Sequence, residues 1–171
     1  MAGMKAVVLG IVWALAGFCC VAADIPIQPN FDAAKFGGTW YPLQLVLDIE
    51  GLKDVKITGR KVTPLDNGDM DVDVEILENG ECTKKLIRFL HTDQPGKFTT
   101  EAGTTIHVVD TDYDSYLFVH VDAGPQKILH FEARDPQGSD SLKEKFKKLA
   151  GSLGFPTDKI KDMPSTDPCS L

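Results

Sequence analysis

The segment Met70–Ile76 alternates apolar and acidic residues at every position, and this pattern constrains the fold more than any other feature of the chain. Its apolar members are Met70, Val72, Val74 and Ile76, and its acidic members are Asp71, Asp73 and Glu75. A period of two puts successive side chains on opposite faces of a β-strand, so one face is dry and the other faces water. Hairpin turn sequences lie on either side, Asp-Asn-Gly at 66–68 and Asn-Gly at 79–80. The segment is therefore predicted to lie within an antiparallel sheet.

Turn residues also separate seven further segments of strand-like composition. These segments are Thr39–Ile49, Val55–Pro64, Cys82–Leu90, Lys97–Thr100, Thr104–Val109, Ser115–Val121 and Lys127–Ala133. Short strands at regular spacing are typical of an all-β barrel or sandwich. We predict an eight-stranded up-and-down antiparallel barrel, because eight strands close without exposed edges around a space for one small ligand. Gly59 is expected to form a bend or bulge in the second strand.

The apolar period changes after residue 139, which predicts a single C-terminal α-helix. The apolar positions of this segment, spaced as one stripe of a helix, are Leu142, Phe146, Leu149, Ala150 and Leu153. Ser139 or Asp140 would cap its start, and Gly154 would end it. A helix that follows all the strands is expected to pack on the outside of the barrel.

The side chains predicted to face the barrel interior are of medium size, which favours a cavity over a filled core. They are Val55, Ile57, Met70, Val72, Val74, Ile87, Phe98, Ile106, Val108, Leu117, Val119 and Val121. Most of them are Val or Ile, and one is aromatic. Val72, in the middle of its strand, is expected to have room beside it for a larger side chain.

The first 23 residues are predicted to be a signal peptide, which leaves one domain at residues 24–171. Lys5 precedes a run of 16 residues, 6–21, that is apolar apart from small residues, and Val21-Ala22-Ala23 fits a signal-peptidase site. This run is shorter than the roughly 20 residues of a membrane-spanning helix. We therefore expect a secreted, extracellular protein with no membrane span. The net charge of −7 argues against nucleic acid as a partner.

Cys82 and Cys169 are the cysteines that remain after residue 23, and they are expected to form a disulfide. A reactive thiol is the alternative, but Cys82 has no histidine near it in the sequence. A zinc site would need more sulfur ligands or a cluster of histidines. No Gly-x-Ser-x-Gly or phosphate-loop motif is present, so the sequence indicates neither an enzyme nor a cofactor.

Three histidines, His107, His120 and His130, fall on adjacent predicted strands. His107 and His130 are predicted to face outward on either side of Phe118, where the helix should dock. A surface metal site is conceivable there, but half-buried packing residues are the preferred interpretation, with no metal bound.

Three short segments resemble the lipocalin signature, in the expected order. They are Gly38-Thr39-Trp40, Thr111-Asp112-Tyr113 and Arg134. The resemblance implies a structural role for them at the closed end of the barrel. The planar guanidinium of Arg134 can lie on the indole face of Trp40, a contact worth about 1–2 kcal/mol when partly desolvated.

A closer resemblance, to the β-lactoglobulin and glycodelin branch of the lipocalins, covers nearly all of residues 24–171. It rests on residues 68–70, 78–82 and 109–113 and on the pair Cys82/Cys169. It implies a carrier whose calyx holds a retinoid- or fatty-acid-like molecule against the twelve interior positions above. A carboxylate head group would lie at the mouth, near Lys53, Lys56 or Lys85. The alternative is a secreted interaction or nutritive protein with an incidental cavity, and a homodimer is left open.

Overall fold

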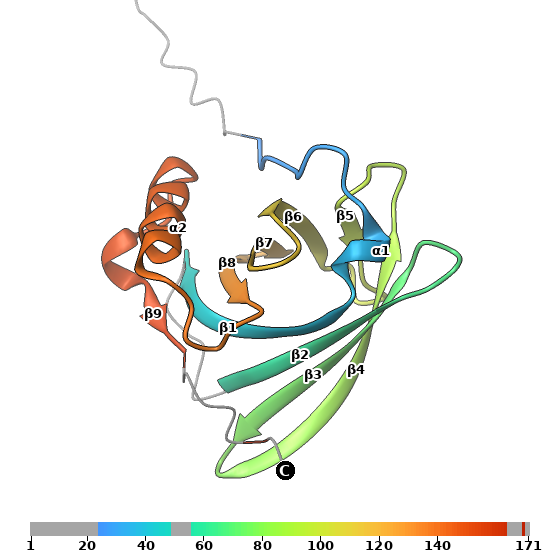
Figure 1. The fold of residues 1–171 in the computed structure, drawn as a ribbon, viewed down its shortest axis with the longest axis horizontal. Coiled ribbons are helices and arrows are strands. Elements are labelled where there is room, and N and C mark those ends of the chain that lie inside the picture. Colours follow the sequence, from blue (N-terminus) through green and yellow to red (C-terminus); the bar gives the residue numbers. More distant parts are fainter. Residues whose placement is uncertain (1–23, 49–55, 164–168, 170–171) are drawn as a thin grey trace, which may run out of the picture.

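An antiparallel sheet closes on itself in the computed structural model, which describes residues 24–48, 56–163 and 169. Its strands are β1 (Gly38–Leu47), β2 (Lys56–Pro64), β3 (Met70–Glu78), β4 (Glu81–His91), β5 (Lys97–Thr99), β6 (Thr105–Thr111), β7 (Tyr116–Ala123) and β8 (Gln126–Ala133). Each strand pairs with the next, and β1 pairs with both β8 and β2, which closes the barrel (Figure 1). The predicted eight-stranded up-and-down barrel is confirmed.

Three short elements were absent from the sequence prediction, and one of them is the helix η1 (Thr157–Lys159) that follows α2. A two-residue strand, β9 (Lys161–Asp162), adds to the outside of β1. A four-residue helix, α1 (Ala33–Phe36), precedes β1 and begins at Asp32, whose side chain accepts a hydrogen bond from the Ala34 N–H. The bulge predicted at Gly59 is confirmed, because the β2–β3 register shifts between Ile57 and Gly59.

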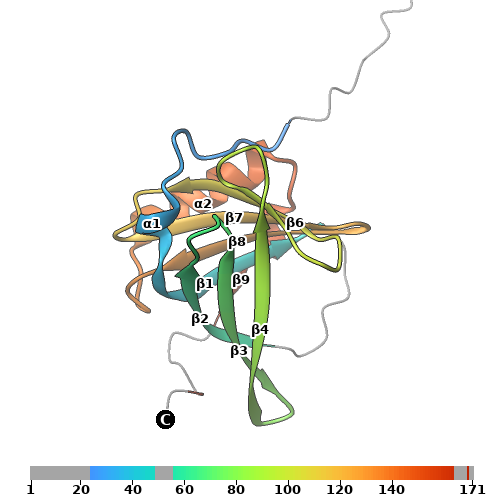
Figure 2. The same cartoon turned by 90° about the vertical axis from the view of Figure 1, so that its right-hand side faces the viewer.

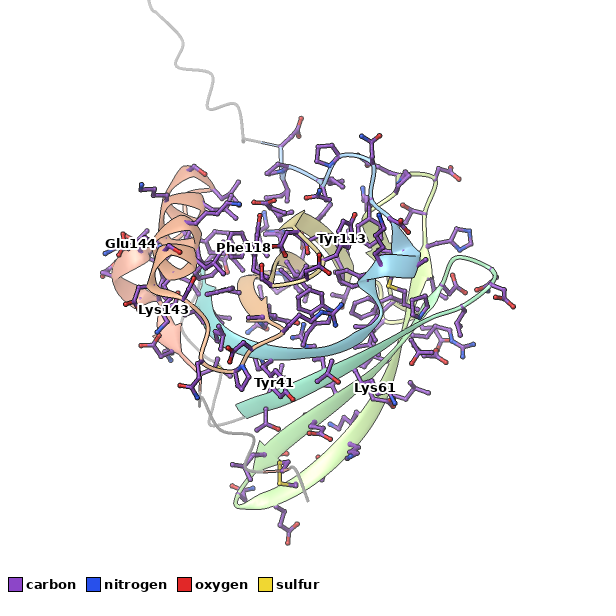
Figure 3. All side chains as sticks on the ribbon, viewed as in Figure 1. Tyr41, Lys61, Tyr113, Phe118, Lys143 and Glu144 are labelled. Atoms are coloured by element: carbon purple, nitrogen blue, oxygen red, sulfur yellow. A yellow bond between two sulfur atoms is a disulfide. The ribbon has the colours of Figure 1, made fainter. Side chains whose placement is uncertain are left out.

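Helix α2 (Asp140–Ser152) packs outside the barrel, as the apolar stripe predicts, and is followed by the short helix η1 (Thr157–Lys159). The Ser139 hydroxyl caps α2 by accepting from the Leu142 N–H at 3.3 Å. Figure 3 shows Phe118 between the barrel and α2, and its ring centroid lies 5.5 Å from that of Phe146 on the helix. The helix thus covers the outer face of β7 and β8 with a second apolar core.

The predicted signature residues meet at the closed end of the barrel. The Arg134 guanidinium carbon lies 3.6 Å from the centre of the fully buried Trp40 ring. Arg134 also donates hydrogen bonds to the backbone oxygens of Gly37 at 2.7 Å and Thr39 at 2.9 Å. Gly38 has φ +104°, and a Cβ there would lie 2.8 Å from Arg134 Nη1, so glycine is required.

The adjoining turn is held by Asp112 and Thr111. The Asp112 carboxylate accepts hydrogen bonds from the Ser115 and Tyr116 backbone N–H groups at 2.8 and 3.0 Å. Thr111 Oγ1 donates to the backbone carbonyl oxygen of Tyr116 at 2.6 Å and accepts from the Tyr113 backbone N–H. These contacts fix the geometry of the turn between β6 and β7.

Arg134→Ala is expected to lower the free energy of unfolding by about 1–3 kcal/mol, because the ring contact and several hydrogen bonds to the backbone are lost together. Urea melts of the wild type and the variant would measure this. Lys148→Ala, on the exposed side of α2, removes the same charge and should change stability by no more than about 0.5 kcal/mol. Equal midpoints for Arg134→Ala and the wild type would contradict the structural role.

A disulfide joins Cys82 to Cys169, as predicted, across a sequence separation of 87 residues. Cys82 lies at the tip of the β3–β4 hairpin, which projects beyond the other strands (Figure 2). Within the described ranges, no helix is long and apolar enough to cross a membrane. The predicted signal peptide, residues 1–23, lies outside the described residues.

Candidate functional site

The barrel interior contains a cavity of about 700 Å³, enough for one small organic molecule. Strands β2, β3, β4, β6, β7 and β8 form its wall, together with the β5–β6 loop. Its apolar lining consists of Ile57, Val74, Ile76, Leu86, Ile87, Phe89, Ile106, Val121 and Ile128. The cavity is therefore a mostly apolar site of the size that suits a small hydrophobic ligand.

The other half of the interior, towards the closed end, is filled. A void of only about 10 Å³ remains there. It is lined by Phe36, Val62, Val72, Phe89, Phe98, Ile106, Val108, Leu117 and Val119, with Arg60 and Glu132. The α1 helix supplies Phe36, whose ring lies 5.9 Å from Trp40 and helps to close this floor.

The twelve predicted ligand positions divide between these two regions. Ile57, Val74, Ile87 and Val121 line the cavity, and Ile106 borders both the cavity and the floor. Val72, Phe98, Val108, Leu117 and Val119 surround the floor void, and Met70 is fully buried in the same core. Val55 lies outside the described residues. The expected free space beside Val72 is not there, because aromatic side chains from α1, β4 and β5 occupy the floor.

The cavity reaches the surface between β4 and the β5–β6 loop. Strand β4 pairs with β5 only at Leu90 and His91, so the residues of β4 before Leu90 have no strand partner on that side within the described ranges. Cavity residues on both sides of this opening are exposed, Ile87 on β4 and Glu101 in the loop among them. Of the predicted mouth lysines, Lys85 is exposed on β4 opposite Val74, while Lys53 and the Lys56 side chain lie outside the described part.

Three polar side chains inside the barrel were absent from the predicted site. Arg60 on β2 and His130 on β8 line the cavity, and Glu132 lies two residues beyond His130 beside the floor void. Arg60 Nη1 forms an ion pair with Glu132 Oε1, and their side chains are 11% and 2% exposed. Arg60 Nε and His130 Nδ1 are buried and have no hydrogen-bond partner among the described residues.

The protonation of these groups follows from their burial. Burial raises the pKa of Glu132, and the neighbouring Arg60 charge opposes that shift. Burial and the Arg60 charge together hold the pKa of His130 well below its ordinary value. His130 is therefore a neutral imidazole at physiological pH, with one nitrogen a donor and the other an acceptor.

Most of the chain that forms this cavity matches a known protein family. The family model described as "Lipocalin / cytosolic fatty-acid binding protein family" matches residues 37–167. The chain is a member of the lipocalin family. Lipocalins in general carry small hydrophobic ligands, and the position of the cavity inside the barrel agrees with that role. The narrower resemblance to the β-lactoglobulin and glycodelin branch stays a prediction.

Curated relatives match this lipocalin over most of its length. It is 35% identical to "Epididymal secretory protein 4" of Zootoca vivipara over 147 residues, 82% of this chain and 83% of that protein. It is 30% identical to "Lipocalin" of Rhinella marina, with 97% and 98% of the two chains covered. A third relative, "Prostaglandin-H2 D-isomerase" of Ovis aries, is 27% identical over 85% of this chain and 84% of its own.

The outer face of this lipocalin carries a pair of histidines rather than the pair that the alternation predicted. His107 and His120 are opposite each other on β6 and β7, with ring centroids 5.6 Å apart. The prediction that His130 faces outward is wrong, because it lines the cavity. Strand β8 is buried on both faces, so the sequence pattern gave no means of telling its inner face from its outer one. Among the described residues, no three His, Cys, Asp or Glu side chains form a metal-ligand group.

Lowering the pH is expected to destabilise this lipocalin through His120, which is 1% exposed and packs against Phe155. Burial and the neighbouring His107 lower the pKa of His120 from 6.5 to about 4. The unfolded imidazole therefore takes up a proton before the folded one, and stability falls as the pH drops from about 7 towards 4. Between about pH 7.5 and pH 5 this histidine should account for a loss of about 2 kcal/mol.

Urea unfolding of the wild type and His120→Phe, each at about pH 7.5 and about pH 5, would measure how much of the loss of stability comes from His120. The pH dependence of the variant should be smaller by about 2 kcal/mol, whatever its stability at neutral pH. Burial also lowers the pKa of His107 and His130, so part of the pH dependence should remain in the variant. An identical pH dependence in the two proteins would rule out His120 as a source.

Proposed function

We propose that this lipocalin is a secreted carrier that holds one retinoid- or fatty-acid-like molecule in the cavity of about 700 Å³. The observation that supports this most is the division of the interior: aromatic residues fill the floor, while smaller aliphatic residues line an open upper half. An apolar cavity exposed to water is unfavourable to maintain unless a ligand fills it. Ile57, Val74, Ile87, Ile106 and Val121 are the predicted residues that we assign to ligand contact.

Secretion and the absence of catalysis are parts of the same proposal. The apolar segment before residue 24 has the composition of a signal peptide, and one relative is named as a secretory protein. Although another relative is named as an isomerase, catalysis by a cysteine in the barrel has no support here. Cys82 and Cys169 are joined to each other, and no other cysteine occurs between residues 24 and 171.

The direct test is to purify the protein from a eukaryotic secretion host, extract it with organic solvent and identify bound molecules by mass spectrometry. The stripped protein is then titrated with a fluorescent fatty acid. We expect saturation at one molecule per chain. No extracted ligand together with no binding of fatty acid, retinol or a neutral apolar dye would favour the alternative of an interaction or nutritive protein.

A further inference from the structure

Two polar side chains, Arg60 and His130, lie at the inner end of the cavity, and a purely apolar ligand would make no use of them. Arg60 and His130 line the cavity, and each has a buried nitrogen without a hydrogen-bond partner among the described residues. Two polar side chains at the inner end of an otherwise apolar cavity are the kind of feature that fixes the orientation and chemical class of a ligand.

From this geometry we propose that Arg60 and His130 hold a ligand with an uncharged hydroxyl head group at the inner end of the cavity, and that Glu132 sets this preference through its ion pair with Arg60. This inference rests on the proposed carrier function and narrows its ligand class to long-chain alcohols. The apolar tail would extend along the cavity towards the opening beside β4. This orientation is the reverse of the carboxylate at the mouth that the lysines suggested.

The hydrogen-bonding capacity of the two cavity residues matches a hydroxyl group. A guanidinium nitrogen can only donate, whereas a neutral imidazole has one donor and one acceptor nitrogen. A hydroxyl group both accepts and donates, so it suits a cavity end that offers a donor on Arg60 and an acceptor on His130. A ketone or an ester can only accept and would leave an acceptor on His130 unpaired.

Glu132 explains why the head group would be uncharged. It lies beneath Arg60, beside the floor void, and its ion pair with Arg60 balances the guanidinium charge. An anionic head group would lose its water shell on entering the cavity. The Arg60–Glu132 pair has no net charge, so it would not offset that loss, and the anion would bind weakly. Glu132 thus acts through Arg60 as a specificity-determining residue and need not touch the ligand.

The test compares dodecan-1-ol with dodecanoate at pH 7.4, each displacing the uncharged fluorescent dye N-phenyl-1-naphthylamine. The wild type should bind the alcohol at least about tenfold more tightly than the carboxylate. Glu132→Gln leaves the Arg60 charge unbalanced, so its affinity for dodecanoate should rise about tenfold while its affinity for the alcohol changes by less than about threefold. The matched control is Glu75→Gln, on the outer face of β3 beside Lys84, and it should behave as the wild type.

A double variant, Arg60→Met with Glu132→Leu, covers the case in which Glu132→Gln does not fold. It replaces the buried pair by apolar side chains of similar size, a change that folds tolerate well. It should bind the dye normally and the alcohol about tenfold more weakly. A wild type that prefers dodecanoate, an unchanged preference in Glu132→Gln, or full affinity of the double variant for the alcohol would each overturn the inference. Failure of the wild type to bind the dye or either chain would instead overturn the carrier function.

Discussion

Replacing Val121 with Trp is expected to abolish ligand binding, by at least about fiftyfold, in a barrel that still folds. Val121 lies on β7 between Ile106 on β6 and Ile128 on β8, its partners in the sheet. All three side chains line the cavity of about 700 Å³, so an indole at position 121 would occupy the space proposed for the ligand. The added ring has room, and the stability of the barrel should change by no more than about 1 kcal/mol.

The same substitution two residues earlier provides the matched control. Val119 lies on the same strand and the same face as Val121, but it borders the filled floor, where a void of only about 10 Å³ remains. Val119→Trp should therefore destabilise the fold by about 1–3 kcal/mol or more, because extra atoms in a packed core force neighbouring side chains out of place.

Circular dichroism melts and titration with a fluorescent fatty acid, run on both variants, separate folding from binding. If Val121→Trp folds and binds as tightly as the wild type, the ligand does not use this cavity. If Val121→Trp unfolds while Val119→Trp does not, the assignment of cavity and floor is reversed.

The strands could be predicted from the sequence because most of them have one buried face and one face exposed to water, which produces an alternation of apolar and polar residues. In β3 the acidic residues point outward and Val72 and Val74 point inward, so the alternation gave the orientation directly. Strand β8 carries no such information. Helix α2 covers its outer face, so Leu129 and Phe131 are as buried outside the barrel as His130 and Glu132 are inside.

The division of the interior into floor and cavity could not be predicted, because it depends on side chains that lie outside the strand pattern. Phe36 comes from α1, a helix too short to produce a period in the sequence. Phe89 packs against Phe98 across the closed end, with ring centroids 6.3 Å apart. Val72 therefore faces a packed wall, whereas Val74, one step further along the same face, faces the cavity. The distance of a residue from the closed end, which alternation does not encode, decides which of the two it lines.

The sequence pattern also failed to identify Arg60 as an interior residue. A charged residue on a strand is ordinarily assigned to the face exposed to water. The sheet register places it directly opposite Trp40 on β1 and Val74 on β3, both of which face inward. The charge is accommodated there because Glu132, on the sequence-distant strand β8, forms an ion pair with it inside the barrel.

Removing the disulfide is expected to lower the free energy of unfolding by about 4 kcal/mol, the largest stability change among these variants. The bond between Cys82 and Cys169 closes a loop of 87 residues, and an unfolded chain freed from so long a loop gains much conformational entropy. The double variant Cys82→Ser with Cys169→Ser avoids a single unpaired thiol, and its urea midpoint should match that of the wild type in reductant. Intact mass after alkylation under denaturing, non-reducing conditions should show no modified thiol in the wild type. Two alkylated thiols there, or a double variant as stable as the wild type, would show that the C-terminal segment is not held to the β3–β4 hairpin by this bond.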